Sequence, residues 1–482
     1  MKVQSEMSPY LKIQKERYRL FDRFSNDVTI HGFRYMFDQQ HWSRRFLWFL
    51  LNTLIFALSF LLFYQIIVDF VQYKTTTTLT TLHDDMGEIQ FPTITVCPFN
   101  SASQTKLQNI FRSLNMTFDP ASHKSIEDPL IKQALAKFVT LKAANITNLY
   151  SVAALYQLNY TDMTSGDIPK QFMQTPCLFY GKGCTTEDFK TVYTWFGSSM
   201  CFQFNSFRKH TTSRKPATLS PIEGFTLLLD LKLYDDFSFG FPAQGISITI
   251  SSYGHPYKVF DGTTSFVSRP GDLAYVKLSL KKAIRIPQPF PNGCGVEEYQ
   301  IIRREYPYTQ AMCWMDCILQ KVYIKCGCVG YEVQDEVTNG TEICGLKENE
   351  CYLKTRRNFT KTKREDCWAK CPKQCDEISY QVSLSSGNLG NTGIFNRLSR
   401  LKSWNKTTEQ ARDYVRNNMV GILISFQDYS VLVEESLRTV TWTHLMGSIG
   451  GSVGLCLGFS LITAFEFLFF IFDYVMVPCR MK

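Results

Sequence analysis

Two long apolar segments constrain this chain more than any other feature of its sequence. The first covers residues 46–70 and the second roughly residues 439–477. Each reaches the length of about 20 residues that a helix needs to cross a bilayer. Inside a membrane the backbone can satisfy its hydrogen-bonding groups only within a helix or a closed barrel. The sequence therefore predicts a membrane protein with two transmembrane helices and about 370 residues between them.

The charges that flank the first segment predict its orientation. Arg44 and Arg45 directly precede it, whereas Asp84, Asp85 and Glu88 follow it. Positive charge favours the cytoplasmic side, and without a small-residue cleavage site the segment is expected to be a signal anchor that stays in the mature protein. Both termini are then cytoplasmic, at the plasma membrane. The predicted parts are a cytoplasmic N-terminus (1–45), transmembrane helix 1 (46–72), an extracellular domain (73–437), transmembrane helix 2 (438–477) and a short cytoplasmic tail (478–482).

Two further patterns in the region between the helices support this topology. Fourteen of the 16 cysteines lie there, and an even number in an oxidising compartment is typical of a disulfide framework. Six glycosylation sequons also lie there, as modification from the lumenal side requires. They are at Asn115, Asn145, Asn159, Asn339, Asn358 and Asn405. The net charge of +9 is not gathered in a basic run, so we expect no nucleic-acid partner.

The extracellular region is predicted to be an α+β domain. Five β-branched segments bounded by Gly, Pro or polar residues predict strands of one central sheet. They cover residues 91–99, 224–233, 245–253, 273–280 and 421–429. The first strand follows transmembrane helix 1 and the last leads into helix 2, so we expect both helices to be attached to this sheet. Helical spacing at 125–144 predicts a peripheral helical part at 107–156, and the cysteine-rich region at about 294–375 is expected to depend on disulfides as well as packing.

The second apolar segment contains more glycine than one packing face requires. Glycines spaced for close helix packing would account for some of them, but each costs about 1 kcal/mol relative to alanine within a helix. The five glycines are Gly447, Gly450, Gly451, Gly454 and Gly458. We expect them to break the helix, and irregular backbone at membrane depth is tolerated where it lines water, as in ion filters. Glu466 adds a carboxylate that should face an aqueous path, and since one helix cannot line a pore, an oligomer is implied.

Five sequence motifs occur in an order that is typical of one family of membrane proteins. The segment GSIGGSVGLCLGFSLITAFEF contains a G-x-S motif at Gly458, Phe459 and Ser460, and TIHGFRYMF contains an HG motif at His31 and Gly32. FPTITVCPFN, GSSMCFQFN and CDEISYQVSLS follow the extracellular pattern. Together they resemble the degenerin/epithelial sodium channel (DEG/ENaC) superfamily. The resemblance covers the whole chain and implies a trimeric channel whose extracellular domain has palm, β-ball, finger, thumb and knuckle parts.

The resemblance also implies roles for particular residues. Gly458, Phe459 and Ser460 correspond to the selectivity filter, and His31 and Gly32 to the cytoplasmic gating motif. The implied pore and gate residues are Gly447, Ser448, Gly450, Gly451, Gly454, Leu455 and Glu466. In the family, bulk at the position of Gly447 holds the gate open, and many relatives have aspartate at the position of Ser448. We therefore expect sodium selectivity and leave calcium permeation open.

Family order implies a set of disulfides that spacing alone does not give. The implied pairs are Cys97–Cys201, Cys177–Cys184, Cys294–Cys375, Cys313–Cys371, Cys317–Cys367, Cys326–Cys351 and Cys328–Cys344. The finger is placed at about 101–165 and the thumb at about 294–375. Tyr73 and Phe290 correspond to an aromatic contact that couples thumb and pore in relatives; two ordinary packed aromatic residues are the alternative.

The stimulus that opens the channel is less constrained. Acid-sensing members have histidines above helix 1 and an acidic loop, where this chain has TTTTLTT and SSYGHPY, with Gly254 and His255 in place of the acidic pair. The spacing of Cys367, Cys371 and Cys375 is more similar to epithelial or peptide-gated members. We expect opening by an extracellular neuropeptide, as in FMRFamide- or RFamide-gated sodium channels, and block by amiloride. Proton gating and constitutive or bile-acid-sensitive opening are the alternatives.

Other classes of protein fit the sequence less well. The 7 histidines are scattered, without metal-binding spacing or a nucleophile motif, so we expect no enzyme, metal site or cofactor. A two-span receptor without a pore would not need the glycines or Glu466, and a nucleotide-gated trimer would not explain the G-x-S motif. The expected partners are related subunits in a homo- or heterotrimer, an extracellular peptide, Na⁺ with Ca²⁺ possible, and membrane lipid.

Overall fold

The chain divides into two compact units. The computed structural model describes residues 9–37, 42–83, 89–99, 102–123, 128–142, 155, 157–165, 175–193, 200–206, 218–220, 223–237, 243–253, 264–290, 293–345, 348–362, 364–402 and 404–480. The first unit consists of Met1–Thr76, Pro289–Pro291 and Ser436–Lys482. The second consists of Thr77–Gln288 and Asn292–Glu435. Each unit is described separately below.

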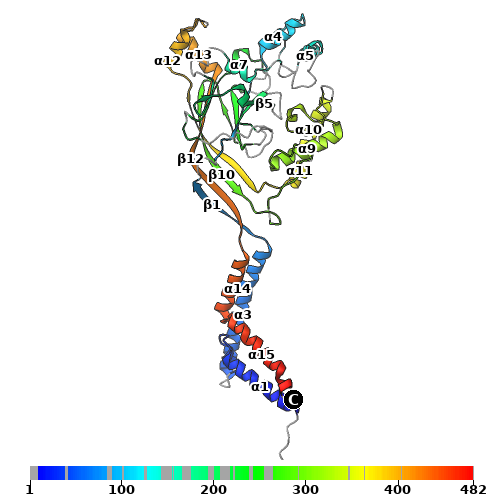
Figure 1. Cartoon of the computed structure of the whole chain (residues 1–482), viewed down its shortest axis with the longest axis vertical. Helices are drawn as coiled ribbons and strands as arrows, with labels where there is room; N and C mark the ends of the chain where they lie inside the picture. The colour runs from blue at the N-terminus through cyan, green and yellow to red at the C-terminus, as the bar shows by residue number, and fades with distance from the viewer. Residues whose placement is uncertain are drawn as a thin grey trace, which may run out of the picture. The chain divides into compact units, whose positions relative to one another are not determined.

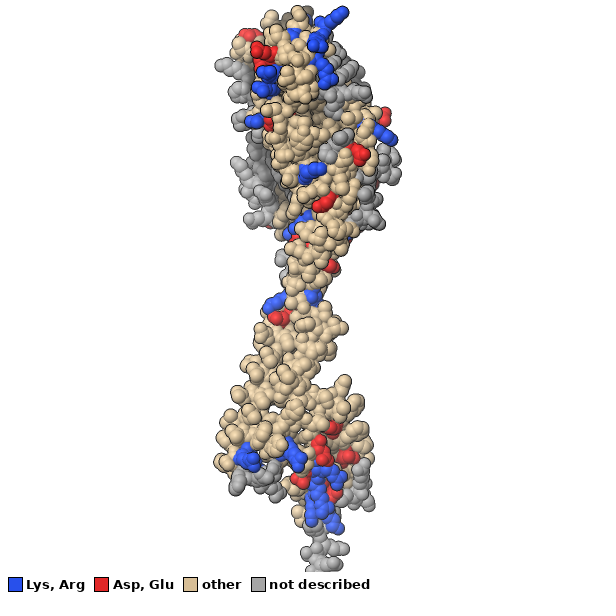
Figure 2. Space-filling view, turned by 90° about the vertical axis from the view of Figure 1, so that its left-hand side faces the viewer, with Lys and Arg blue, Asp and Glu red and all other residues tan. Residues whose placement is uncertain are grey.

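The first unit is helical. Its helices are α1 (Pro9–Asp27), α2 (Phe33–Phe37), α3 (Trp42–Val71), α14 (Trp442–Leu457) and α15 (Leu461–Arg480). Helix α14 packs along α3, and α1 packs against α15 (Figure 1). By length and composition Trp42–Val71 and Leu461–Pro478 can each span a membrane. Figure 2 shows a band of this unit without charged side chains on the face drawn, and charges gather at the end that holds α1.

The larger sheet of the second unit has seven strands. Their order is β11-β10-β12-β7-β3-β4, and β1 pairs with β12 off this path. The strands are β1 (Thr75–His83), β3 (Cys177–Phe179), β4 (Lys182–Gly183), β7 (Phe225–Asp230), β10 (Asp272–Ile284), β11 (Asp376–Asn388) and β12 (Met419–Arg438). Strands β10 and β12 are parallel, and the pairs β10–β11 and β12–β7 are antiparallel. Alternate residues of β10, such as Val276 and Leu278, are buried, as a sheet with one face on a core requires.

A second sheet of five strands packs with the first around a shared core. Its order is β5-β6-β2-β8-β9. The strands are β2 (Thr93–Pro98), β5 (Phe189–Tyr193), β6 (Met200–Phe204), β8 (Ile246–Ser251) and β9 (Thr264–Ser268). Phe204 of this sheet and Phe225 of the other lie 4.4 Å apart between ring centroids. The prediction of one central sheet was therefore wrong, because apolar alternation shows that a strand is half-buried and not which strand it pairs with.

Strand β1 was absent from the sequence prediction. Its residues 75–83 are threonine-rich and exposed along the whole strand, so the segment lacks the apolar alternation that identifies a half-buried strand. Because β1 directly follows α3 and pairs with β12, which directly precedes α14, both membrane helices continue into neighbouring strands of the seven-stranded sheet. The expected attachment to one sheet is present, but through β1 and not through β2, which belongs to the other sheet.

Two groups of helices cover parts of the second unit. The region assigned to the finger, about 101–165, contains α4 (Gln104–Ser113), α5 (Pro129–Lys142) and α7 (Tyr160–Thr164), which contribute Phe111, Ile131 and Met163 to the main core. Helices α12 (Thr392–Ser399) and α13 (Thr408–Asn418) pack on each other around Phe395, Leu398 and Val415. Short 3₁₀ turns are η1 (Thr186–Asp188), η2 (Leu233–Asp235) and η3 (Tyr331–Val333).

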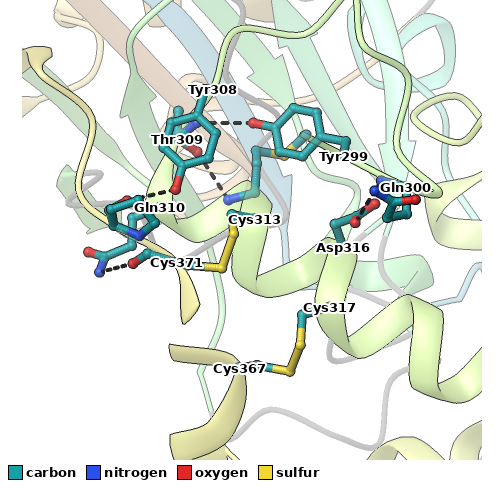
Figure 3. The surroundings of a disulfide bond; sticks show 12 residues. Tyr299, Gln300, Tyr308, Thr309, Gln310, Cys313, Asp316, Cys317, Cys367 and Cys371 are labelled. Carbon is teal, nitrogen blue, oxygen red and sulfur yellow. Dashed lines mark hydrogen bonds between the residues drawn. A yellow bond between two sulfur atoms is a disulfide. The ribbon is translucent and has the colours of Figure 1, made fainter. Parts of the chain in front are cut away.

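The cysteine-rich region folds around a central helix. Helix α9 (Gln310–Cys326) begins at Thr309, which accepts from the Met312 N–H, and ends at Gly327 in the left-handed conformation. Helices α10 (Asn349–Thr362) and α11 (Arg364–Lys370) lie against it. Figure 3 shows two disulfides of α9 and the carboxylate of Asp316, which accepts from the N–H groups of three consecutive residues, Gln300, Ile301 and Ile302.

The described residues form seven disulfides that join the pairs implied by family order. Five lie in the cysteine-rich region: Cys294–Cys375, Cys313–Cys371, Cys317–Cys367, Cys326–Cys351 and Cys328–Cys344. Cys97–Cys201 crosses the neighbouring strands β2 and β6, and Cys177–Cys184 closes the β3–β4 hairpin. Cys317–Cys367 and Cys326–Cys351 join α9 to α11 and to α10, and because the cysteine-rich region has only small apolar clusters, its bridges carry part of the stability that a larger core would supply.

Candidate functional site: the interrupted membrane helix

The glycine-rich segment forms two helices with an interruption at residues 458–460. Helix α14 ends at Leu457, and Gly458 follows in the left-handed conformation with φ +66°. The Gly458 N–H donates to the Gly454 carbonyl at 2.8 Å, which closes the last turn. A side chain at this φ would cost about 1–2 kcal/mol. The helix therefore breaks within this segment, as the sequence predicted, and the break is a helix end capped by glycine.

Ser460 starts the helix that follows. Its hydroxyl accepts from the Thr463 N–H at 3.3 Å, and its own N–H donates to the Thr463 hydroxyl at 3.1 Å. This reciprocal pair is a helix N-cap. The Ser460 hydroxyl thus has a structural role in starting α15, and the Ser460 carbonyl accepts from the Ala464 N–H at 3.1 Å. Gly458 and Phe459 therefore supply the backbone carbonyl groups that lie outside regular helix. The Phe459 carbonyl oxygen lies 3.7 Å from the point where a Cβ on Gly454 would stand.

The HG motif lies against this interruption. The His31 N–H donates to the Leu457 carbonyl at 3.0 Å, and the His31 ring is 2.8 Å from where a Cβ on Gly458 would stand. Gly32 has φ +78°, and a Cβ there would lie 2.6 Å from the Asn52 amide of α3. The two motifs are therefore complementary: Gly458 has no side chain where His31 packs, and Gly32 has none where Asn52 packs.

A hydroxyl and a carboxylate extend this contact one turn further along α15. The Thr29 hydroxyl lies 2.6 Å from the Thr463 hydroxyl, and it donates to the Glu466 carboxylate at 3.1 Å. The Thr29 N–H donates to the same carboxylate at 3.1 Å. Glu466 is thus bound by the segment that carries the HG motif. Sequence reasoning singled out Glu466 but missed Thr29 and Leu457, because residues more than 400 positions apart give no periodic signal, and it also missed Asn52, whose contact with Gly32 depends on how two helices pack.

The remaining glycines leave open space along α14. A Cβ on Gly447, Gly450 or Gly451 would meet no heavy atom of the described chain within 4 Å. Leu455, one turn beyond Gly451, is 87% exposed. Ser448 lies with its hydroxyl 3.4 Å from the His444 ring. In the single chain these residues form an exposed stripe along α14.

An aromatic contact joins the end of α3 to the segment before Cys294. The rings of Tyr73 and Phe290 meet edge to face, with 5.1 Å between their centroids. Tyr73 lies just after α3 with φ +53°, an uncommon conformation for a tyrosine. The contact that the family resemblance implied is therefore formed, and its role in coupling remains a proposal.

Of the implied glycosylation sites, Asn115, Asn159, Asn339 and Asn405 lie on the exposed surface. Asn145 and the side chain of Asn358 lie outside the described residues, as do Gly254 and His255 of the loop compared with acid-sensing members. Within the described part of the chain no group of three or more His, Cys, Asp or Glu side chains is arranged to hold a metal ion.

A comparison with models of protein families identifies the family of this chain. The model of the amiloride-sensitive sodium channel family matches residues 24–470, which include α3, α14, the first half of α15 and the whole region between α3 and α14. The chain belongs to this family. It is thereby a member of the DEG/ENaC superfamily of ion channels and not an enzyme, and it is a two-span protein of the plasma membrane with both termini cytoplasmic.

Several characterised members of the family are similar over most of this chain. A bile acid-sensitive ion channel of Rattus norvegicus is 24% identical, over 95% of this chain and 88% of that protein. The acid-sensing ion channel 4-B of Danio rerio is 23% identical, over 96% and 77%. Degenerin del-1 of Caenorhabditis elegans is 24% identical, over 73% and 53%. Members of the amiloride-sensitive sodium channel family assemble as homo- or heterotrimers and conduct Na⁺, so this chain is one subunit of such a pore.

Proposed function

We propose that this chain forms a ligand-gated, sodium-permeable pore whose selectivity filter is Gly458, Phe459 and Ser460. The observation that carries the proposal is the interruption between α14 and α15, where three residues leave the helix. Carbonyl groups from three subunits at this level would replace part of the hydration shell of a small cation. The Ser460 hydroxyl caps α15, so the backbone and not this side chain is the expected source of ligand oxygens.

We assign gating roles to the groups on either side of the filter. On the cytoplasmic side His31 and Gly32 hold the N-terminal segment against Leu457 and Gly458, and Thr29 binds Glu466. Movement of this segment would release the Leu457 carbonyl and the Glu466 carboxylate together. On the extracellular side of the filter the exposed stripe of Gly447, Gly450, Gly451 and Leu455 is the proposed gate face, with Ser448 and Gly454 beside it.

The proposed stimulus is an extracellular amidated peptide, and amiloride is the proposed blocker. The sequence feature that supports a peptide is the spacing of Cys367, Cys371 and Cys375, which is more similar to epithelial or peptide-gated members. The threonine-rich strand β1, which stands where acid-sensing members have histidines, disfavours opening by protons. A bile acid is the second candidate, because a bile acid-sensitive channel matches 95% of this chain. Opening by protons is the third, since burial and the charge of Asp235 raise the pKa of Asp236 to about 7.

Whole-cell current from cells that express this chain alone tests the proposal. Amidated RFamide peptides, a bile acid and steps to acidic pH are applied separately in sodium solution, and amiloride is the control in each case. Current evoked by peptide at constant pH, blocked by amiloride, is the expected result. Current with a bile acid or acid alone would replace the peptide by that stimulus. Silence to all three, with the protein at the surface, would contradict a homomeric ligand-gated channel.

A further inference from the structure

An arginine sits among aromatic rings at the end of β12. The Arg438 guanidinium lies 3.9 Å from the ring centroid of Phe70, 5.5 Å from that of Tyr73 and 5.6 Å from that of Phe290. Phe70 also meets Trp442 edge to face at 4.7 Å. We call these five residues the Arg438 cluster. All of them belong to the helical unit, which includes the short segment around Phe290.

The members of the Arg438 cluster come from three parts of the chain that are far apart in the sequence. Phe70 lies in the last turn of α3, and Tyr73 lies between α3 and β1. Arg438 is the last residue of β12, and Trp442 is the first residue of α14. The backbones on the two sides are joined directly, since the Thr439 N–H donates to the Lys74 carbonyl at 2.9 Å. The Arg438 side chain therefore contacts the end of α3 and the segment that leads to Cys294, and Phe70 connects it to Trp442 at the start of α14.

The aromatic rings are the main partners of this charge. The Arg438 Nη2 donates to the Phe70 carbonyl at 3.3 Å, whereas its Nε is buried without a hydrogen-bond partner. Within the described residues Arg438 forms no ion pair, and the neighbouring Lys74 is paired with Asp69. A cation over aromatic faces is attracted by their quadrupoles, more strongly where water is excluded. Arginine suits such a site because its planar group stacks on rings and stays charged.

We propose that Arg438 is a positioning residue for gating, and that its positive charge holds the ends of both membrane helices to Phe290. This goes beyond the contact between Tyr73 and Phe290, because it makes the charge of a third residue necessary for that contact. It rests on the channel function of the family and not on the identity of the stimulus. Residues that line the pore are not part of the cluster, so ion selectivity should not depend on Arg438.

Currents from Arg438→Gln, Arg438→Lys and the wild type test this proposal. The readout is the ratio of resting to maximally evoked amiloride-sensitive current, normalised to surface protein. We expect Arg438→Gln to change this ratio about fivefold or more, as the loss of a desolvated cation–π contact would. Arg438→Lys should change it less, and the Na⁺/K⁺ permeability ratio should stay at the wild-type value in both. Arg269→Gln, which removes an exposed arginine paired with Asp272, is the matched control and should have no effect.

Charge restoration separates this role from a merely structural one. In Arg438→Cys, a cationic methanethiosulfonate reagent should bring the current ratio back towards the wild-type value, whereas a neutral reagent of similar size should not. The wild-type chain receives both reagents as the control for Cys456. In a double-mutant cycle, Phe290→Leu should add little to Arg438→Gln, since both remove the same contact. Equal rescue by both reagents, or additive effects, would overturn the proposal.

A measurement without current keeps the test independent of the proposed stimulus. If the wild type gives no current, the homomeric ligand-gated function fails, but purified channel in detergent still reports on the Arg438 cluster by hydrogen exchange. Amide exchange in the peptide that contains Thr439 should be about fivefold faster in Arg438→Gln than in the wild type, and intermediate in Arg438→Lys. Equal exchange in all three proteins would show that the charge does not hold these segments together.

Discussion

At the scale of single residues, Gly458 combines two requirements that only glycine meets. It ends α14 in the left-handed conformation, and the His31 ring occupies the space that a side chain would need. We predict that Gly458→Ala lowers the amiloride-sensitive current more than tenfold at equal surface amount. Alanine at this φ would cost about 1–2 kcal/mol of backbone strain, and its Cβ would also overlap the His31 ring. Gly387→Ala in β11 is the matched control, because a Cβ there meets nothing within 4 Å and the residue lies outside the membrane helices, and it should keep at least half of the current. Equal currents from both variants would contradict this account.

Asp236 gives a second prediction at this scale, about pH. Burial, and then the negative charge of Asp235, raises the pKa of Asp236 from 3.8 to about 7. The folded state therefore favours the protonated carboxyl group. Its stabilising contribution is complete below about pH 4, decreases as the pH rises towards 7, and is absent above that value. The thermal midpoint of the purified channel should rise from pH 8 to pH 5.5 more steeply in the wild type than in Asp236→Asn. The same slope in both proteins would refute the assignment.

At the scale of elements, α10 is fastened to the turn η3 by a buried ion pair. Arg356 of α10 donates to Glu332 at 2.8 Å, and the Tyr352 hydroxyl donates to the same carboxylate. Removing one member leaves a buried charge and costs about 3–5 kcal/mol. Arg356→Ala should lower the thermal midpoint and speed proteolysis between Cys326 and Cys351. Arg304→Ala, which breaks a pair whose side chains are 74% exposed on both sides, should change neither, and a comparable loss in that variant would disprove the distinction.

Elements also show how far the sequence determines the fold. Helix α5 lies within the segment whose apolar spacing predicted a helix, because one of its faces packs on a core. Strand β1 was missed because its threonines face solvent and its only strong signal, pairing with β12, is not local. The two-sheet arrangement was missed for a similar reason. The motifs of the candidate site were found by resemblance, but the contact of His31 with Leu457 joins residues that no local pattern connects.

At the scale of the whole molecule, the topology predicts which asparagines carry glycans. Asn115, Asn339 and Asn405 are exposed and lie between the two membrane helices. Each substitution by glutamine should remove one step from the apparent mass of the protein expressed in cells, and enzymatic deglycosylation should abolish the differences between variants. Absence of any shift on deglycosylation would contradict the extracellular placement of the region between the helices.

The pairing of β1 with β12 has a further consequence for protein engineering. The chain leaves one membrane helix and returns to the other through adjacent strands, and adjacent strands lie only about 4.8 Å apart. The chain between the two membrane helices therefore starts and ends on neighbouring strands, so its two ends lie close together. The extracellular region of another subunit could be transplanted at Thr75 and Arg438 with two short junctions, so that stimulus and conductance become exchangeable modules.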